Sequence, residues 1–127
     1  MKRILIVDDE VEFCNLVEEM LKSAGYTNVI KCSDSREAIP AVMHEKPDLI
    51  LMDIKMPVIT GDVIAAELKN NEETKKIPIV FLTALVGENE AELSEHVIGN
   101  HLFLAKPVRM KELLQVVKEA LNPTEVI

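Results

Sequence analysis

Short aliphatic runs alternate with longer stretches of helical periodicity along the chain, and this alternation limits its possible folds more than any other feature. Five runs have the length and aliphatic content of buried strands: residues 4–7, 29–32, 49–52, 77–82 and 101–105. Five further segments are predicted to be helices: residues 11–24, 34–46, 61–70, 88–97 and 110–121. Strands that alternate with helices indicate an α/β fold, with a parallel sheet, helices on both faces and right-handed crossovers.

The ends of several predicted helices carry their own sequence signals. Gly25 follows the first helix at the position where glycine commonly ends helices. Asp34 and Glu37 form a capping-box pattern at the start of the second helix, and Thr60 is placed to cap the third. Pro40 lies beyond the first turn of the second predicted helix, where it removes a backbone hydrogen bond, so we expect it to bend that helix.

The composition is that of an ordinary globular domain and argues against several classes of function. The 127 residues suit a single domain, spanning residues 1–127. A net charge of −8 argues against direct nucleic-acid binding, which needs a basic face. The longest apolar runs are far too short to span a bilayer, so no membrane partner is expected. Cys14 and Cys32 lack metal-binding spacing, and we expect buried free thiols in a cytoplasmic protein.

Four of the five predicted strands are followed at once by side chains that can carry out chemistry. These residues are Asp8 and Asp9 after the first strand, Asp53 after the third, Thr83 after the fourth and Lys106 after the fifth. Singly, each has an ordinary structural explanation, such as an acidic turn, a helix cap or a solvated lysine. Parallel strands, however, end at the same edge of a sheet, where open α/β sheets bind their ligands. Together, these residues therefore predict a functional site at that edge.

The residue types at this edge favour phosphoryl chemistry with a divalent cation. Clustered carboxylates repel one another unless a cation lies between them. A ligand set made of oxygens, with an open side, suits Mg²⁺, which keeps water molecules that a phosphate can replace. Lys106 and Thr83 can then contact the other oxygens of a phosphoryl group. A carboxylate can itself be the nucleophile, and Asp53 is the best candidate because it stands alone at the end of its strand.

Four motifs, in order along the chain, resemble those of a known protein family. They are ILIVDDE at residues 4–10, DIKMP at residues 53–57 with Gly61, Thr83-Ala84, and Lys106-Pro107. Together they resemble the receiver domain of two-component response regulators, of the single-domain chemotaxis or phosphorelay type, over about residues 2–121. The resemblance implies a flavodoxin-like doubly wound sheet in the order 2-1-3-4-5 with five helices. It also implies a phosphoacceptor that is not a conventional enzyme.

The same resemblance implies roles for the acidic residues. Asp53 would accept a phosphoryl group from a phosphohistidine, which a sensor histidine kinase or a histidine phosphotransfer protein would carry. Asp9, Asp53 and the backbone carbonyl of Lys55 would hold Mg²⁺. Asp8 would act on the metal through water.

The resemblance further implies a conformational switch. Lys106 would pair with the phosphoryl group, Thr83 would donate a hydrogen bond to it, and Phe103 would be the switch aromatic. The peptide bond between Lys106 and Pro107 is expected to be cis. Phosphorylation would then change the face formed by the last two helices and the strand between them, and a downstream protein would bind there.

Two alternatives are left open by the sequence. The chain ends a few residues after the last predicted helix, which favours a stand-alone receiver. A receiver cut from a longer regulator with a DNA-binding or enzymatic output domain would show the same pattern. A phosphatase of the haloacid dehalogenase type also uses aspartate, lysine and Mg²⁺, but it needs two aspartates separated by one residue, whereas Asp8 and Asp9 are adjacent.

Overall fold

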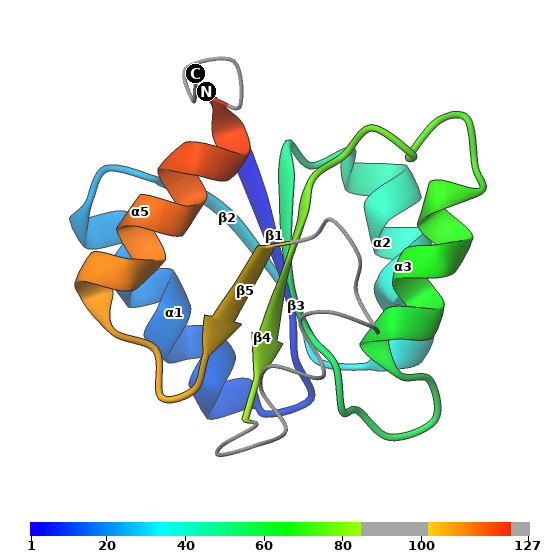
Figure 1. Ribbon diagram of the computed structural model, residues 1–127, viewed down its shortest axis with the longest axis horizontal. Coiled ribbons are helices and arrows are strands. Elements are labelled where there is room, and N and C mark those ends of the chain that lie inside the picture. The colour runs from blue at the N-terminus through cyan, green and yellow to red at the C-terminus, as the bar shows by residue number, and fades with distance from the viewer. Residues whose placement is uncertain (85–101, 123–127) are drawn as a thin grey trace.

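Five parallel strands form one sheet at the centre of the molecule, in the order β2-β1-β3-β4-β5 (Figure 1). The computed structural model describes residues 1–84 and 102–122. The strands are β1 Arg3–Val7, β2 Asn28–Cys32, β3 Leu49–Asp53, β4 Ile79–Thr83 and β5 Leu102–Ala105. The helices within the described residues are α1 Val11–Ser23, α2 Ala38–Glu45, α3 Gly61–Lys69 and α5 Met110–Leu121, with a short 3-10 helix, η1, at Ser35–Glu37. The predicted α/β fold and its strand order are confirmed, while the helix predicted at 88–97 and His101 lie outside the described residues.

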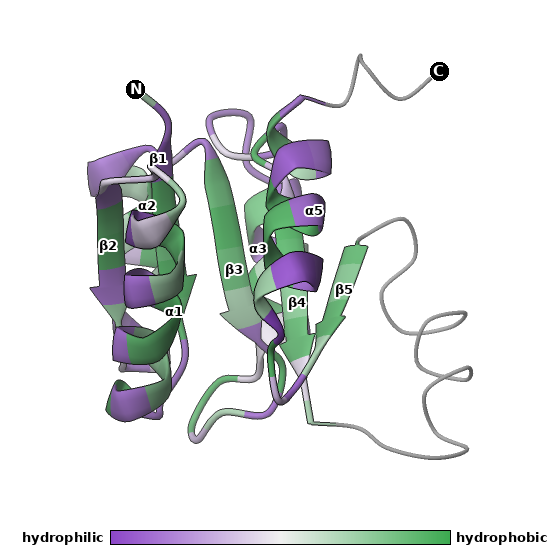
Figure 2. Cartoon of the chain, turned by 90° about the vertical axis from the view of Figure 1, so that its left-hand side faces the viewer, coloured by the Kyte–Doolittle hydropathy of each residue, from purple (hydrophilic) through white to green (hydrophobic). Residues whose placement is uncertain are grey.

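The sheet separates two apolar cores. Helices α1 and α5 cover one face and α2 and α3 cover the other (Figure 1). Successive strand residues point to opposite faces, so neighbours such as Leu5 and Ile6 pack into different cores. The strands are accordingly hydrophobic along most of their length (Figure 2), as expected for a parallel sheet covered on both sides. Among the described helices, none has both the length and the apolar character needed to cross a membrane.

The first helix ends as its sequence predicts. Gly25 has a positive φ of 98°, a left-handed conformation that glycine adopts without steric cost. The N–H of Gly25 donates to the carbonyl of Lys22, and the N–H of Tyr26 donates to the carbonyl of Leu21, each at 3.0 Å. This pair of bonds is the Schellman arrangement, which satisfies carbonyls at the end of a helix.

The second helix begins later than predicted, and this changes the position of Pro40 within it. Asp34 caps η1, because its side chain accepts a hydrogen bond from the N–H of Arg36 at 2.9 Å. Helix α2 then starts at Ala38, so Pro40 lies in its first turn. N–H groups of a first turn have no acceptor within the helix, so the prediction that Pro40 removes a helical hydrogen bond is wrong.

Helix α3 begins in close contact with the end of β3. Thr60 occupies the capping position, as predicted, but its side chain makes no capping hydrogen bond. Gly61 donates its N–H to the carbonyl of Ile54 at 2.8 Å. A Cβ at residue 61 would clash with the backbone carbonyl of Asp53. The glycine therefore allows the helix to approach the strand end where the candidate site lies.

The loop between β3 and α3 contains a strained turn. Val58 has a φ of 73°, and the N–H of Ile59 donates to the carbonyl of Pro57 at 2.9 Å across it. This is a γ-turn with positive φ, which is rare and costly for a β-branched residue. The buried Ser35 holds the turn: its hydroxyl donates to the carbonyl of Pro57 at 2.6 Å and accepts from the N–H of Ile59 at 3.3 Å.

Candidate functional site

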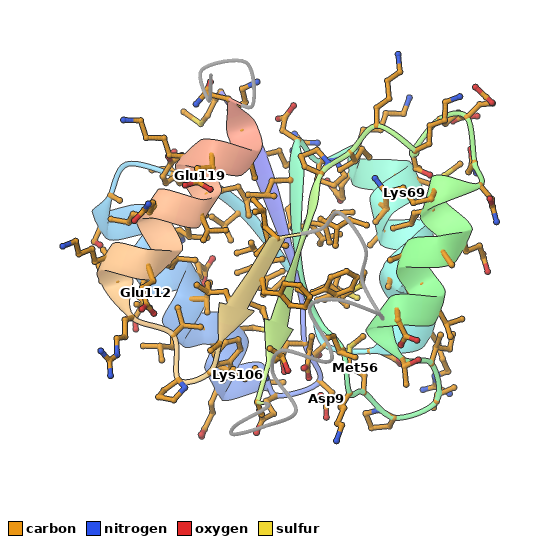
Figure 3. All side chains as sticks on the ribbon, viewed as in Figure 1. Asp9, Met56, Lys69, Lys106, Glu112 and Glu119 are labelled. Atoms are coloured by element: carbon orange, nitrogen blue, oxygen red, sulfur yellow. The ribbon has the colours of Figure 1, made fainter. Side chains whose placement is uncertain are left out.

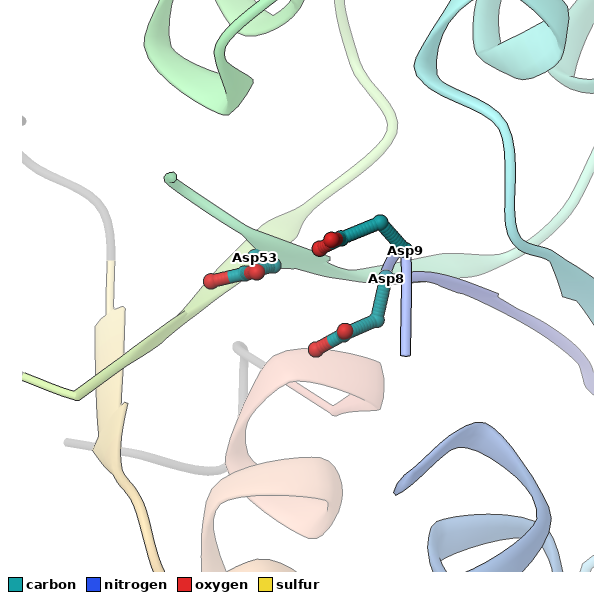
Figure 4. Close-up of side chains that lie close together, drawn as sticks. All are labelled: Asp8, Asp9 and Asp53. Atoms are coloured by element: carbon teal, nitrogen blue, oxygen red, sulfur yellow. The ribbon is translucent and has the colours of Figure 1, made fainter. Parts of the chain in front are cut away.

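Three carboxylates meet at the C-terminal edge of the sheet (Figure 4). One oxygen each from Asp8, Asp9 and Asp53 lies within 4.8 Å of the others. The strand register explains the meeting, because Val7 of β1 pairs with Met52 of β3, and Asp8 and Asp53 come directly after that pair. Asp8 is 0% exposed and Asp53 is 6% exposed, while Asp9 is the most accessible of the three.

Lys106 brings a positive charge to the carboxylates. Its Nζ lies 2.8 Å from Oδ2 of Asp8 and 3.6 Å from Oδ2 of Asp53. The lysine side chain is only 14% exposed. It follows β5, and its N–H donates to the backbone carbonyl of Thr83 at 2.8 Å, which fixes its position against the end of β4. The bond between Lys106 and Pro107 is cis, as expected.

The pKa values of Asp53 and Lys106 are both raised, but for different reasons. Burial, together with the charges of Asp8 and Asp9, raises the pKa of Asp53 to about 6, although Lys106 opposes that change. Burial lowers the pKa of Lys106, but its hydrogen bond to Asp8 and the charge of Asp53 outweigh that effect and raise it. The lysine is therefore fully charged at neutral pH, and the folded protein holds the Asp53 carboxylate at a free-energy cost.

The two oxygens of Asp8 are already engaged by the protein. Oδ1 accepts a hydrogen bond from the N–H of Glu10 at 2.9 Å, and Oδ2 accepts one from Lys106 at 2.8 Å. Asp9 and Asp53 therefore offer the more available oxygens of the cluster. This donor set, with two available carboxylates beside an open cleft, fits a hard divalent cation that keeps some of its water.

A cleft of about 320 Å³ opens beside the carboxylates. Its lining includes Asp9, Asp53, Lys55, Thr83 and Lys106. The structure thus gathers at one place the residues that the sequence predicted for phosphoacceptor, metal and phosphoryl contacts, with Asp8 buried beneath them. Figure 3 shows Asp9 and Lys106 at this end of the sheet.

Phe103 lies apart from the cleft. It is the second residue of β5 and packs against the core on the α2 and α3 face of the sheet. Its ring centroid is 6.4 Å from that of Phe81, with the planes tilted by 41°. The two residues are paired across β4 and β5, two positions before Thr83 in β4. Phe103 is partly buried: part of its side chain packs against the core, and the rest is exposed at the edge of the sheet that β5 forms.

Two residues around Lys106 were missed by the sequence analysis. Oε1 of Glu10 lies 3.6 Å from its Nζ, and the ring centroid of Phe13 lies 4.3 Å from it. Glu10 could have been suspected because it continues the acidic run of Asp8 and Asp9. Phe13 gave no such signal, since an aromatic residue in the first turn of an amphipathic helix is usually a core residue.

The amino-acid sequence matches a known family over nearly its whole length. The model of the response regulator receiver domain matches residues 4–118. The phosphate regulon transcriptional regulatory protein PhoB of Pseudomonas aeruginosa is 35% identical over 123 residues, which are 97% of this chain and 53% of PhoB. The polar-differentiation response regulator DivK of Brucella anthropi is 28% identical over 121 residues, which are 95% of this chain and 97% of DivK. The chain thus spans about half the length of PhoB and nearly all of DivK.

A solved structure shows the same fold with a metal in its cleft. The receiver domain of a sensor histidine kinase from Pseudomonas aeruginosa is 30% identical, with a TM-score of 0.82 over 95% of this chain and 98% of that one. Its crystal structure has a magnesium ion coordinated in the active site cleft. Because the family model covers most of the sequence, and because the fold and the acidic edge agree with it, the chain belongs to the response regulator receiver domain family.

Proposed function

We propose that the chain is a phosphoacceptor in two-component signalling, and that Asp53 accepts a phosphoryl group from a phosphohistidine. The observation that carries the proposal is the placement of Lys106 between Asp8 and the nearly buried Asp53, beside an open cleft. An Asp53 carboxylate oxygen forms the new bond to phosphorus, the bond from phosphorus to the imidazole nitrogen breaks, and the electron pair leaves with that nitrogen. A receiver domain is not a conventional enzyme, because the phosphoryl group ends on the protein itself.

The donor is proposed to be a sensor histidine kinase or a histidine phosphotransfer protein. Membership of the receiver family implies the kinase as a partner class. The cleft suits a phosphorylated imidazole because it is open to solvent at Asp9 while Asp53 lies deeper. After transfer, Lys106 stays beside the new phosphoryl group, and the Thr83 side chain lines the same cleft, where its hydroxyl can donate to a phosphoryl oxygen.

The site is proposed to bind Mg²⁺ through Asp9, Asp53 and the backbone carbonyl of Lys55. The available oxygens of the two carboxylates and the position of Lys55 at the cleft support this assignment. Asp8 would contact the metal through water, because both of its oxygens already accept hydrogen bonds from the protein. When bound, Mg²⁺ supplies positive charge that offsets the mutual repulsion of the carboxylates and the phosphoryl oxygens.

The output surface is proposed to include β5 and α5, together with the helix predicted at 88–97. A groove of about 350 Å³ runs between β5 and α5, lined by apolar Phe103 and Val116 and by acidic Glu112 and Glu119. Both glutamates project from α5 along one side of the molecule (Figure 3). Phe103 links this groove to the core, so a rearrangement at Thr83 can reach the surface through it. We propose that a downstream protein binds there, and that neither nucleic acid nor membrane does, given the net charge of −8.

We propose a single receiver domain over residues 1–127 that acts in the cytoplasm, where the buried thiols of Cys14 and Cys32 stay reduced. Relatives of two kinds match it: DivK, which has about the same length, and PhoB, which is about twice as long. The output is accordingly either a separate protein or a DNA-binding or enzymatic domain of a longer regulator. The family match argues against the haloacid dehalogenase alternative.

Phosphorylation of the isolated protein tests the proposal. Acetyl phosphate with Mg²⁺ should add one phosphoryl group, seen by intact mass spectrometry, and Asp53→Asn should abolish the addition. Asp62→Asn is the matched control, because Asp62 lies in the first turn of α3 but does not line the cleft, and this variant should be labelled like the wild type. Stoichiometric labelling of the Asp53→Asn variant would show that another residue is the acceptor.

A further inference from the structure

The ammonium group of Lys106 has both carboxylates and an aromatic ring as neighbours. Three carboxylates lie near its Nζ: that of Asp8 at 2.8 Å, and those of Asp53 and Glu10 at 3.6 Å each. The aromatic ring of Phe13 also lies against it, with the centroid 4.3 Å from Nζ. That distance is well within the range of a cation–π interaction, in which the negative face of the ring attracts the cation.

Phe13 is held firmly in this place. It is in the first turn of α1, is partly buried, and packs against the core on the α1 and α5 face of the sheet. Its neighbour Cys14 is buried and donates its thiol to the backbone carbonyl of Asp8 at 3.2 Å. The N–H of Cys14 donates to the carbonyl of Glu10 at 3.1 Å. The start of α1, and with it the ring, is thus tied directly to the acidic loop.

We propose that Phe13 is a positioning residue, which holds the ammonium of Lys106 over the carboxylates so that it can pass from Asp8 to the phosphoryl group on Asp53. The proposal rests on the proposed function. An aromatic face suits this task because it attracts the cation but has no lone pair that fixes one N–H. The three N–H donors of the lysine remain available for oxygens. An aliphatic side chain would fill the space without attracting the charge.

Substitutions at residue 13, made in the wild type and in a Lys106→Met background, separate the attraction of the ring from its volume. Phe13→Leu keeps an apolar side chain of similar size and removes the aromatic face. Phe13→Tyr keeps the face and should behave like the wild type. We expect the rate of phosphorylation by acetyl phosphate at saturating Mg²⁺ to fall in Phe13→Leu by roughly two- to thirtyfold, the range that cation–π energies span. In a Lys106→Met background, Phe13→Leu should cause no further loss, whereas a general packing defect would lower the rate in both backgrounds.

A spectroscopic measurement in EDTA tests the contact without activity. The ring current of Phe13 should shift the ε-methylene protons of Lys106 upfield in NMR spectra of the wild type and Phe13→Tyr, and the shift should vanish in Phe13→Leu.

The outcomes distinguish the two proposals. If the wild type is phosphorylated and Phe13→Leu reacts as fast or faster, the role of Phe13 is overturned and the proposed function stands. If Lys106 shows no ring-current shift in the wild type, the contact and the role built on it are also overturned. If the wild type itself takes no phosphoryl group, the proposed function fails, and the role of Phe13 in the transfer fails with it.

Discussion

At the scale of single residues, burial changes the pH at which the carboxyl of Asp53 becomes charged. Its pKa rises from an ordinary value of 3.8 to about 6 in the folded protein, first because it is buried and next because Asp8 is near. Between these two pH values the folded chain binds a proton that the unfolded chain has lost. The contribution of Asp53 to stability is therefore fully present below pH 3.8 and is lost as the pH rises through 6.

This sign predicts that Asp53→Asn stabilises the protein at neutral pH. In EDTA at pH 7.5, urea denaturation should give a free energy of unfolding about 1–3 kcal/mol higher than that of the wild type. The difference should shrink as the pH falls through 6 and approach zero only below pH 3.8, where Asp53 is neutral in both the folded and the unfolded protein. A variant less stable than the wild type at pH 7.5 would mean that Lys106 more than compensates the buried charge.

The engaged oxygens of Asp8 predict a ranking of the two neighbouring aspartates in metal binding. Asp9→Asn should weaken Mg²⁺ binding more than Asp8→Asn does, because Asp9 offers the more available carboxylate and Asp8 already accepts bonds from Glu10 and Lys106. Calorimetric titration of both variants measures the ranking. Equal losses, or a larger loss for Asp8→Asn, would contradict the assignment of Asp9 as the direct ligand.

At the scale of elements, two glycines with different surroundings predict different costs. Gly61→Ala brings a methyl group against the backbone carbonyl of Asp53, whereas nothing lies within 4 Å of a Cβ at residue 25. Gly25→Ala should lower the free energy of unfolding by about 1 kcal/mol, because alanine adopts a positive φ only with steric strain. Gly61→Ala should cost about 1–3 kcal/mol and also slow phosphorylation, because β3 and α3 must move apart. Urea denaturation and phosphorylation of both variants measure these effects. If Gly61→Ala is phosphorylated as fast as the wild type, the expected effect of the clash on the site is contradicted.

The strained turn at Val58 predicts a stabilising substitution. Val58 is 76% exposed, so glycine there loses little packing and removes the cost of a positive φ at a β-branched residue. Val58→Gly should raise the free energy of unfolding by about 1 kcal/mol. The control is Val63→Gly, on the exposed side of α3, which should lower it by about 0.5 kcal/mol because glycine is a poor helix former. Destabilisation by both substitutions would show that the turn is not strained.

The bounds of an element were predictable where a local sequence pattern determines them. Contacts between segments far apart in the sequence were harder to predict. The aliphatic runs gave all five strands, and Gly25 gave the end of α1. The start of α2 was placed too early because a capping signal at Asp34 serves a 3-10 turn as well as an α-helix. The acidic site was predictable because parallel strands end at one edge. The contact of Phe13 with Lys106 was not, since it depends on how α1 packs against the end of β5.

At the scale of the whole molecule, a phosphoryl mimic should affect the edge of the sheet at β4 and β5 more than the edge at β2. Beryllofluoride with Mg²⁺ should change hydrogen exchange from β4 to the start of α5, because Lys106 and Thr83 meet the new ligand and Phe103 is linked to them. Mass spectrometry of peptides measures the pattern, and Asp53→Asn with the same reagent is the control. Changes confined to residues 25–47 would contradict the switch.

The division of the interior by the sheet has a consequence for how such proteins can diversify. Phe13 belongs to the core under α1 and α5, whereas Phe103 and Phe81 belong to the core under α2 and α3. Substitutions that repack one core leave the other largely untouched. A lineage can therefore change the packing around Phe13 and the packing around Phe103 through substitutions whose effects on stability are nearly additive, because the two residues lie in different cores.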